Sequence, residues 1–346
     1  MPARVAAVRP RWAIESGRIT IEGSEFPVDR PHLPAVHVGD APARVVYASS
    51  TRIAALVPPG LEGGRTPIRI DGVNGETPVI DIAPPFATGL HQVDNPVFDR
   101  DGNLYVTYSG TRGQQVPVSI FRVRPNGTRE TFCTGLVNPT SMAIGPDGDL
   151  YVSSRFEGTV YRVSADGSIA PFATDLGVPC GLAFDREGTL FVGDRSGTIF
   201  RVDRAGQAKT HALVPSSVAA FHLAFGPDEA LYVTAPTLSP YDSVFKIDRS
   251  GAMTIRYTGF GRPQGIAFDL RGDLFVVEAL AGVSGLYRLP SGNGVPGDDV
   301  PELMLAGPTL VGVAFGPNGT VVVCSNDTAY RLSGTTLNAE TAEHAE

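Results

Sequence analysis

Short apolar stretches separated by turn residues recur six times between residues 95 and 332. Each copy contains an apolar run, a tight turn that usually ends in glycine, and a second apolar run, as in GLAFDREGTLFV at 181–192. Two such runs joined by a tight turn predict a β-hairpin. One apolar position aligns the copies at spacings of 46, 40, 41, 43 and 47 residues: Phe98, Ile144, Phe184, Phe225, Phe268 and Phe315.

Further apolar runs follow each hairpin. A third run is present in every copy, as in TVYRV at 159–163, and a fourth is visible in the first four copies, as in APFAT at 170–174. Four strands repeated every 40–47 residues are typical of a propeller blade, since a β-solenoid has shorter, parallel rungs. The pattern therefore predicts an all-β chain with a six-bladed β-propeller.

The sixth copy has no fourth run of its own. After Leu332 the chain becomes polar, and residues 336–346 form an acidic tail. The segment PPFATGL at 84–90, ahead of the first copy, matches APFATDL at 170–176. Residues 85–89 are therefore expected to supply the outer strand of the last blade, which closes the ring and removes an open sheet edge. The propeller is expected to span residues 83–335.

Residues 1–82 form a separate domain in this interpretation. Apolar and polar residues alternate there between Gly and Pro turns, which predicts a half-buried antiparallel β-sandwich. The segments that carry the alternation are 17–26, 35–46, 52–61 and 66–72.

Composition narrows the classes of function. The net charge of −8 argues against a nucleic-acid partner, which requires a basic surface. No run approaches the ~20 apolar residues that span a bilayer, so no membrane association is expected. Three cysteines cannot form a disulfide framework and the N-terminus shows no apolar signal segment, so the cytoplasm is the default location. A trimmed secreted protein would have the same N-terminus.

One face of the propeller is the candidate working face. The turns inside the hairpins are short and uniform, whereas the loops after the second strand are irregular and long at 108–119, 235–243 and 278–285. Variable loops on a rigid scaffold are typical of a binding face.

Strand register places a set of polar residues at the mouth of the channel on that face. Carboxylates and a histidine that converge in a cleft are the ingredients of an acid/base or metal site. The candidate catalytic residues are Asp94, Asp194, His222 and Glu278, and the candidate ligand-binding residues are Tyr108, Thr140, Arg155, Cys180, Arg195 and Asn326.

Two other interpretations of these residues stay open. Asp194 or Glu278 can pair with Arg155 or Arg195, in which case the funnel holds only water and ion pairs. Cys180 and His222 enter from adjacent blades, and a thiolate–imidazole pair there could attack an electrophile.

The first domain also contains a characteristic set of glycine, proline and apolar residues. They are Gly17, Ile19, Ile21, Gly23, Phe26, Val38-Gly39, Val57-Pro58-Pro59-Gly60 and Gly64. In these residues it resembles an IPT/TIG domain, a kind of immunoglobulin-like module. Such domains are usually spacers or contact modules, so the resemblance implies a protein contact through this domain.

The repeats share the pattern Gly-[Leu/Ile]-Ala-Phe followed by Asp-Gly-x-Leu-[Tyr/Phe]-Val. In this pattern residues 85–335 resemble NHL propellers and the senescence marker protein/gluconolactonase superfamily. The resemblance implies a lactone or ester hydrolase that holds a divalent cation, Ca²⁺ or Mg²⁺. The alternative is a non-catalytic propeller that recognises a small molecule, a glycan or a protein.

The cation ligands implied by that resemblance are a Glu entering blade one and an Asn and an Asp entering later blades. The matching steps here are Val93-Asp94-Asn95, Pro179-Cys180-Gly181 and Pro263-Gln264-Gly265, so Cys180 and Gln264 depart from the pattern. Because a Ca²⁺ or Mg²⁺ site needs several oxygen ligands, the best remaining set is Asp94, Asn95, Gln264 and Glu278.

Overall fold

The computed structural model describes residues 2–28, 33–75, 77–219, 221–280, 282–290 and 300–332. Within these ranges the chain is all-β, with one 3₁₀ turn, η1 (Pro317–Gly319), and no α-helix. It follows that none of the described segments is an apolar helix of membrane-spanning length. The predicted tail at 336–346 lies outside the described residues.

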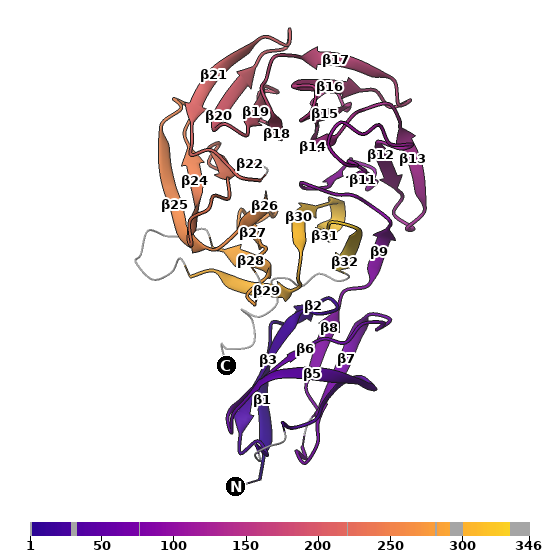
Figure 1. The fold of residues 1–346 in the computed structure, drawn as a ribbon, viewed down its shortest axis with the longest axis vertical. Helices are drawn as coiled ribbons and strands as arrows, with labels where there is room; N and C mark the ends of the chain where they lie inside the picture. The colour runs from indigo at the N-terminus through magenta and orange to yellow at the C-terminus, as the bar shows by residue number, and fades with distance from the viewer. Residues whose placement is uncertain are drawn as a thin grey trace.

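Six four-stranded blades form the ring in Figure 1, as the repeats predict. The first three blades are β10 (Val97–Phe98), β11 (Leu104–Thr107), β12 (Ile120–Val123) and β13 (Arg129–Cys133); β14 (Pro139–Ile144), β15 (Leu150–Ser154), β16 (Thr159–Val163) and β17 (Ile169–Ala173); and β18 (Pro179–Phe184), β19 (Leu190–Asp194), β20 (Thr198–Val202) and β21 (Ala208–Leu213). The last three are β22 (His222–Phe225), β23 (Leu231–Thr234), β24 (Asp242–Ile247) and β25 (Met253–Phe260); β26 (Pro263–Phe268), β27 (Leu274–Glu278), β28 (Gly285–Leu289) and β29 (Glu302–Ala306); and β30 (Leu310–Phe315), β31 (Val321–Ser325), β32 (Thr328–Leu332) and β9 (Pro85–Thr88).

In several turns of the propeller an aspartate binds the backbone of its own turn. In the first blade Asp99 Oδ1 accepts the N–H groups of Asp101 and Asn103, at 3.0 and 2.8 Å. Gly102 supplies the positive φ of 80° that the turn requires. Since Asp185, Asp248 and Asp269 bind their turns in the same way, these loops are structural.

The ring closes as predicted. β9 pairs antiparallel with β32, with Thr88 opposite Thr328 and Ala87 opposite Ala329. The outer strand of the last blade therefore comes from the residues that precede the first blade, and the sheet edge at β32 is covered.

The N-terminal domain is a β-sandwich whose strands pack their alternating apolar residues inward. Its strands are β1 (Arg4–Arg9), β2 (Trp12–Ala13), β3 (Arg18–Ser24), β4 (Val36–Val38), β5 (Ala41–Ala48), β6 (Arg52–Leu56), β7 (Gly64–Ile70) and β8 (Val79–Ile82). The predicted segment 35–46 is a hairpin of β4 and β5 rather than one strand, because Gly39 turns the chain with a φ of 64°. The core includes Ile19, Ile21, Ile53, Ile68 and Ile80.

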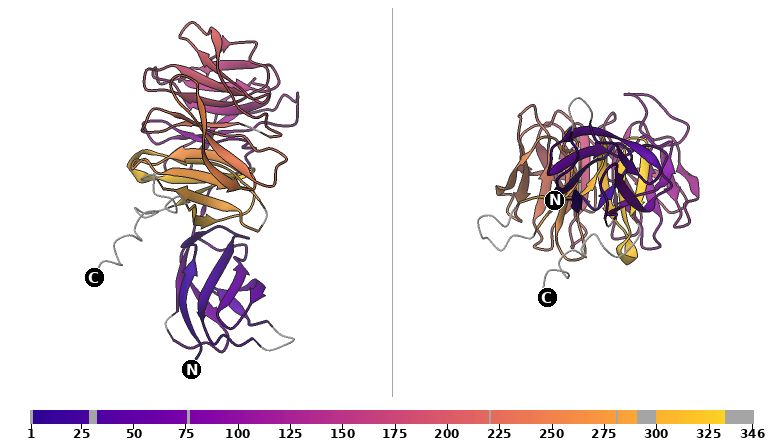
Figure 2. Two further views of the ribbon diagram at one scale, coloured as in Figure 1. Left: turned by 90° about the vertical axis from the view of Figure 1, so that its left-hand side faces the viewer. Right: turned by 90° about the horizontal axis from the view of Figure 1, so that it is seen from below.

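The sandwich is joined to the propeller by main-chain pairing. β2 pairs in parallel with β8 of the sandwich and with β29 of the fifth blade, so one sheet of 12 strands runs through both domains. The other five blades are separate four-stranded sheets. Figure 2 shows the sandwich lying beyond the edge of the ring, which makes the molecule elongated.

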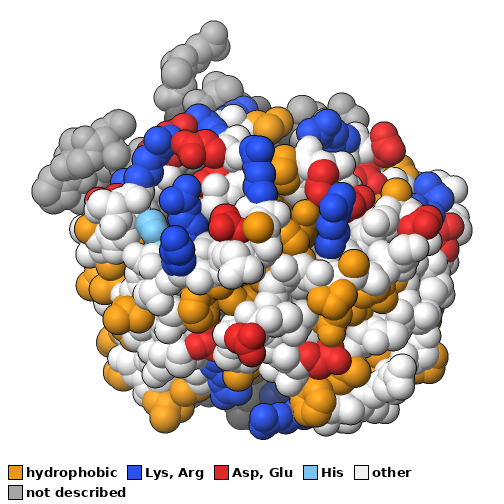
Figure 3. All heavy atoms as spheres, turned by 90° about the horizontal axis from the view of Figure 1, so that it is seen from above, with side chains coloured by type: hydrophobic (Ala, Val, Ile, Leu, Met, Phe, Trp, Pro, Cys, Tyr) orange, Lys and Arg blue, Asp and Glu red, His pale blue; other side chains and the backbone are white. Residues whose placement is uncertain are grey.

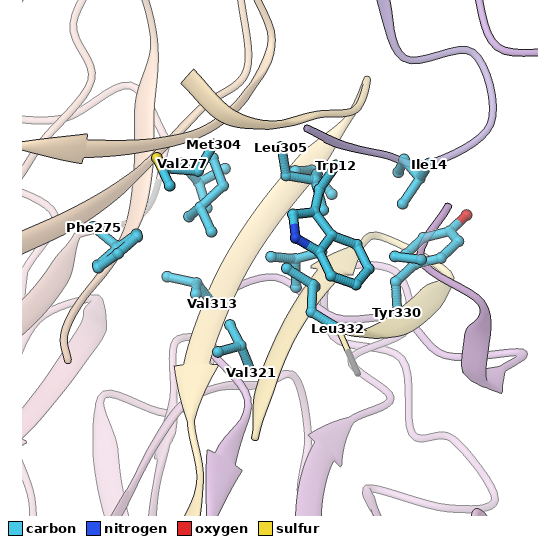
Figure 4. Packing of buried hydrophobic residues seen from close by; sticks show 14 residues of the cluster. Trp12, Ile14, Phe275, Val277, Met304, Leu305, Val313, Val321, Tyr330 and Leu332 are labelled. Carbon is cyan, nitrogen blue, oxygen red and sulfur yellow. The ribbon is translucent and has the colours of Figure 1, made fainter. Parts of the chain in front are cut away.

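A hydrophobic cluster covers this junction. Trp12 is 5% exposed and belongs to the same buried cluster as residues of the fifth and sixth blades. In Figure 4 its indole lies among Leu305, Leu332 and Tyr330. Trp12 therefore fastens the sandwich to the ring.

Candidate functional site

Asp94 and His222 meet at the axis of the propeller. Asp94 precedes the innermost strand of blade one, and His222 begins the innermost strand of blade four, β22. These blades lie three apart in a ring of six, so the pair bridges opposite sides of the channel. A hydrogen bond joins His222 Nδ1 to Asp94 Oδ1. His222 is 0% exposed and Asp94 is 2% exposed.

The two ring nitrogens of His222 have different partners. Nδ1 faces Asp94, whereas Nε2 lies 3.4 Å from Gln264 Oε1, a residue of blade five. An imidazole that donates its Nδ1 proton to Asp94 keeps a lone pair on Nε2, and Gln264 can meet that lone pair only with its amide N–H turned toward the ring in place of Oε1. This arrangement, a carboxylate on one nitrogen and a basic second nitrogen, is that of an oriented general base.

Asp94 is itself held in place by backbone bonds. Its Oδ1 accepts the N–H of Asn95 at 2.7 Å, and its carbonyl accepts the Nε2 of Gln92 at 2.7 Å. Gln92 is fully buried, and its Oε1 accepts the N–H of Thr107 at 2.7 Å. Gln92 thus fixes the loop that carries Asp94 to strand β11, a role that the sequence pattern did not suggest.

The channel below this pair is hollow. A cavity of about 340 Å³ extends along the innermost strands from Asp94 and Asn95 at one end. At the hairpin-turn end it is lined by Phe98, Phe225 and Phe315, among other apolar residues. The Asp94 end is therefore the polar end of an otherwise apolar channel.

The side chain of Asn95 forms hydrogen bonds between blades. Its Nδ2 donates to the carbonyl of Ile266 at 2.7 Å, and its Oδ1 accepts the N–H of Val313 at 3.0 Å. The side chain thereby links the entry of blade one to the innermost strands of blades five and six. Because both Nδ2 and Oδ1 of the amide are hydrogen-bonded, Asn95 has a structural role at the ring closure.

Glu278 and Asp194 bind backbone in the loops of their own blades. Glu278 accepts three N–H groups, from Gly261 at 2.6 Å, Arg262 at 2.9 Å and Leu280 at 2.6 Å. Asp194 accepts the N–H of Val178 at 2.7 Å and the hydroxyl of Ser196. Neither carboxylate pairs with Arg155 or Arg195, and neither is free in the way that an acid/base group requires.

These bonds also bear on the predicted cation ligands. Of the four, Asn95 and Glu278 direct their oxygens to backbone N–H groups. Among the described residues no three His, Cys, Asp or Glu side chains are grouped so as to hold a metal ion. The side chains as placed do not fit a Ca²⁺ or Mg²⁺ site, which needs six or more oxygen ligands. The divalent cation therefore stays a prediction.

Three of the predicted ligand-binding residues bind backbone carbonyls of nearby loops. Thr140 is buried and donates to the carbonyl of Asn138 at 3.0 Å, and Asn326 donates to the carbonyl of Gln92 at 3.4 Å, so both support loops. Arg195 is exposed and donates to the carbonyls of Ser217 and Val218.

Arg155, Tyr108 and His91 form a second part of the channel mouth. The ring of Tyr108 lies edge-on to His91, with centroids 6.2 Å apart. Burial, together with the positive charge of Arg155, lowers the pKa of His91. His91 is therefore a neutral imidazole next to a cation, and sequence analysis did not select it.

The thiol of Cys180 is not activated as a nucleophile. Its pKa is raised to about 12, mainly by burial, with the raising effect of Asp94 and Asp194 set against the lowering effect of Arg155 and Arg195. The thiolate–imidazole hypothesis requires a lowered pKa. Cys180 is instead a buried neutral thiol at the channel wall.

A buried asparagine holds the long loop of blade one. Asn138 Nδ2 donates to the carbonyls of Ser109 and Thr111 at 2.7 and 2.8 Å, and its Oδ1 accepts the N–H of Gly113 at 2.6 Å. Its φ of 48° is a conformation that asparagine adopts more readily than most residues. The signal for this residue was weak, since Asn138 precedes a proline in an ordinary loop.

The fold and the channel define a six-bladed propeller with a polar axial site. Residues 82–237 match the SMP-30/Gluconolactonase/LRE-like region, and residues 5–93 match the IPT/TIG domain. An IPT/TIG-like region therefore precedes a propeller whose residues 82–237 are similar to the gluconolactonase-like family. No curated protein matches the sequence.

Solved structures share this fold at low identity. A protein described as a candidate gluconolactonase is 15% identical with a TM-score of 0.57, over 72% of this chain and 90% of that chain. A catalytically inactive virginiamycin B lyase from Staphylococcus aureus, with one histidine replaced by alanine and quinupristin present, is 17% identical with a TM-score of 0.53, over 86% and 96%. An auxiliary nutrient binding protein from Bacteroides thetaiotaomicron is 12% identical with a TM-score of 0.56, over 96% and 98%.

Proposed function

We propose that the propeller hydrolyses a small lactone or ester in its channel, with His222 as the general base and Asp94 as the residue that orients it. The observation that carries this proposal is the buried Asp94–His222 hydrogen bond between opposite blades.

The cost of this pair argues for a role beyond stability. Burying a carboxylate and an imidazole loses hydration, and well-packed apolar residues at such positions are often as stable or more stable. Four of the five residues equivalent to His222 in other blades are small, Gly181, Gly265, Gly312 and Ser141, and the fifth is Asn95. The fold therefore needs no histidine here.

The chemistry follows from the two nitrogens. His222 Nε2 takes a proton from water while the water oxygen attacks the ester carbonyl, and Asp94 stabilises the imidazolium that forms. The proton then passes from Nε2 to the leaving alkoxide as the acyl–oxygen bond breaks, which gives a carboxylic acid and an alcohol. The 3.4 Å contact with Gln264 is long for a hydrogen bond, so water can replace it at small cost.

A panel of lactones and aryl esters tests this proposal on the full chain. We expect turnover of at least one member by the wild-type protein, and a loss of about 10²–10⁴-fold in kcat for His222→Gln, the usual contribution of a general base. Asp94→Asn should reduce kcat with a smaller change in KM. His37→Gln, which changes a histidine of the sandwich, is the matched control.

The same panel contains the outcomes that reject the proposal. Activity that survives His222→Gln would assign the chemistry to other residues. No turnover in the presence or absence of added Ca²⁺ and Mg²⁺ would remove the hydrolase altogether.

A second candidate function is recognition of a small molecule or glycan without catalysis. The structure of a protein described as nutrient binding aligns with 96% of this chain, through both domains. Binding of a sugar or lactone that is retained in His222→Gln, without turnover in either protein, would favour this alternative.

A further inference from the structure

A second cavity lies at the hairpin-turn end of the propeller, between blades three and four. Its volume is about 700 Å³. It is reached from the face opposite the loops that carry Asp94 and Arg155, although Phe225 and Phe268 line both this cavity and the axial channel. Neither the axial site nor the proposed hydrolysis uses it.

Other blades show how this region is normally closed. In blades one, two and four a tyrosine of the second strand donates its hydroxyl to an aspartate of the hairpin turn, at 3.0–3.2 Å. A basic residue of the third strand pairs with an acid nearby. These pairs are Arg122 with Glu130, Arg162 with Asp147 and Asp149, and Lys246 with Asp228.

Blade three departs from this arrangement at three positions. Phe191 replaces the tyrosine and has no hydroxyl to bind the turn. Arg201 replaces the paired basic residue and makes no ion pair with any described residue. His211 occupies the position of Phe132 and Phe172, and its ring lies edge-on to Phe191 with centroids 5.0 Å apart. Two groups that can carry positive charge therefore border the cavity without a counter-ion.

The acidic residues around the cavity are already engaged. Asp185 and Asp248 accept N–H groups of their own turns. Glu229 pairs with Arg186 at 3.4 Å and also with Arg249, so the rim is a bridge of ion pairs between the two blades. Figure 3 shows basic and acidic side chains interspersed on one side of the molecule, with more of them toward its upper part. Arg201 is thus a cationic group of the lining that can pair with a ligand without first breaking an ion pair to a described residue.

The walls of the cavity are aromatic. Phe184, Phe225 and Phe268 occupy the aligned position of blades three, four and five and line the cavity together. They are half-buried, and Phe191 packs edge-on against Phe225 with centroids 5.1 Å apart. An aromatic ring stacks well on such a surface, while a guanidinium beside it binds a carboxylate.

We propose that this cavity, between Phe184, Phe225 and Arg201, binds a small aromatic carboxylate. The aromatic walls hold the ring, and Arg201, with His211 beside it, holds the carboxylate. The site is separate from the axial Asp94–His222 pair, so it can hold a regulatory ligand or a second molecule while the channel works.

Calorimetric titration of the full-length protein with 1-naphthoate tests the proposal. We expect 1-naphthoate to bind at least tenfold more tightly than the neutral 1-naphthamide. Arg201→Gln should weaken 1-naphthoate at least tenfold and leave 1-naphthamide unchanged. His211→Phe, which gives blade three the residue of blades one and two, should also weaken 1-naphthoate.

Two control variants locate the effect. Arg162→Gln removes the counterpart of Arg201 in blade two, and His222→Gln changes the axial site; both should bind 1-naphthoate like the wild type. Equal affinity for the acid and the amide, unchanged affinity in Arg201→Gln, equal weakening in Arg162→Gln, or no binding below millimolar concentration would overturn the proposal. Because the probe is read by heat of binding, these outcomes do not depend on hydrolysis in the channel.

Discussion

The junction between the two domains yields a quantitative prediction at Trp12. This residue is the single tryptophan of the chain, and it is 5% exposed in the cluster between sandwich and propeller. Its indole Nε1 is buried and has no hydrogen-bond partner among the residues that the structure describes. Replacement by alanine and by phenylalanine should therefore have very different effects on the free energy of unfolding.

The two magnitudes follow from burial. A buried tryptophan removes about 150–250 Å² from water, which at about 25 cal/mol per Å² is worth roughly 4–6 kcal/mol. The unpaired indole N–H offsets about 1–3 kcal/mol of this. Trp12→Ala should accordingly destabilise by about 1–5 kcal/mol. Trp12→Phe keeps a ring in the cluster and removes the unpaired N–H, so its effect should stay within about 1 kcal/mol of zero.

Urea unfolding followed by far-ultraviolet circular dichroism measures both effects, because neither variant retains a tryptophan for fluorescence. The wild-type protein supplies a second readout, since its emission reports only on the junction and should shift to the red when the domains separate. A loss below 1 kcal/mol for Trp12→Ala, or equal losses for both variants, would refute the reasoning that the indole fastens the domains.

Three further predictions concern a buried thiol, a loop and the ring closure. Burial raises the pKa of Cys180 to about 12, whereas the thiol of an unfolded chain ionises near 8.5. The unfolded state therefore loses its proton first, and the free energy of unfolding should fall as the pH rises from about 9 toward 12. This fall should be less steep in Cys180→Ala. An unchanged slope in denaturation at these pH values would contradict this. Asn138→Ala removes three hydrogen bonds to residues 109–113 and should speed amide exchange in that loop while amides of other blades keep their rates. Ala87→Pro removes a backbone N–H from the strand opposite Ala329 and should lower the free energy of unfolding by roughly 3 kcal/mol; an unchanged free energy of unfolding in urea would contradict this.

The repeats made most of the fold predictable. Six copies of one hairpin pattern fixed the blade number, and the likeness of 84–90 to 170–176 predicted that β9 completes the last blade. The missed strands are those that tertiary pairing defines. β2 is two residues long, too short for any periodicity, and becomes a strand because β8 and β29 flank it.

The fourth strand of blade five was missed for a related reason. β29 comes after the long connection 291–299, which lies outside the described residues and displaces the strand from its place in the repeat. Its sequence, ELMLA, also lacks the Phe-Ala-Thr pattern found at 86–88 and 172–174.

The site was predictable in position but not in bonding. Register placed Asp94 and His222 at the same end of the channel, since both stand where an innermost strand begins. Sequence could not show that Glu278 and Asn95 direct their oxygens to backbone N–H groups. The partner of Asn95 lies 218 residues away in the chain, and the partners of Glu278 belong to irregular loops that have no periodic signal. Gln92 escaped notice because a buried amide leaves no periodic signal.

The protonation of His222 tests the central claim most directly. A long-range ¹H–¹⁵N spectrum of the imidazole groups, recorded for the wild type and for Asp94→Ala, reports which ring nitrogen carries the proton. We expect a protonated Nδ1 whose proton is shifted far downfield in the wild type and moves back in Asp94→Ala. A His222 protonated on Nε2 alone, with the same spectrum in both proteins, would contradict the assignment of this pair as an oriented base.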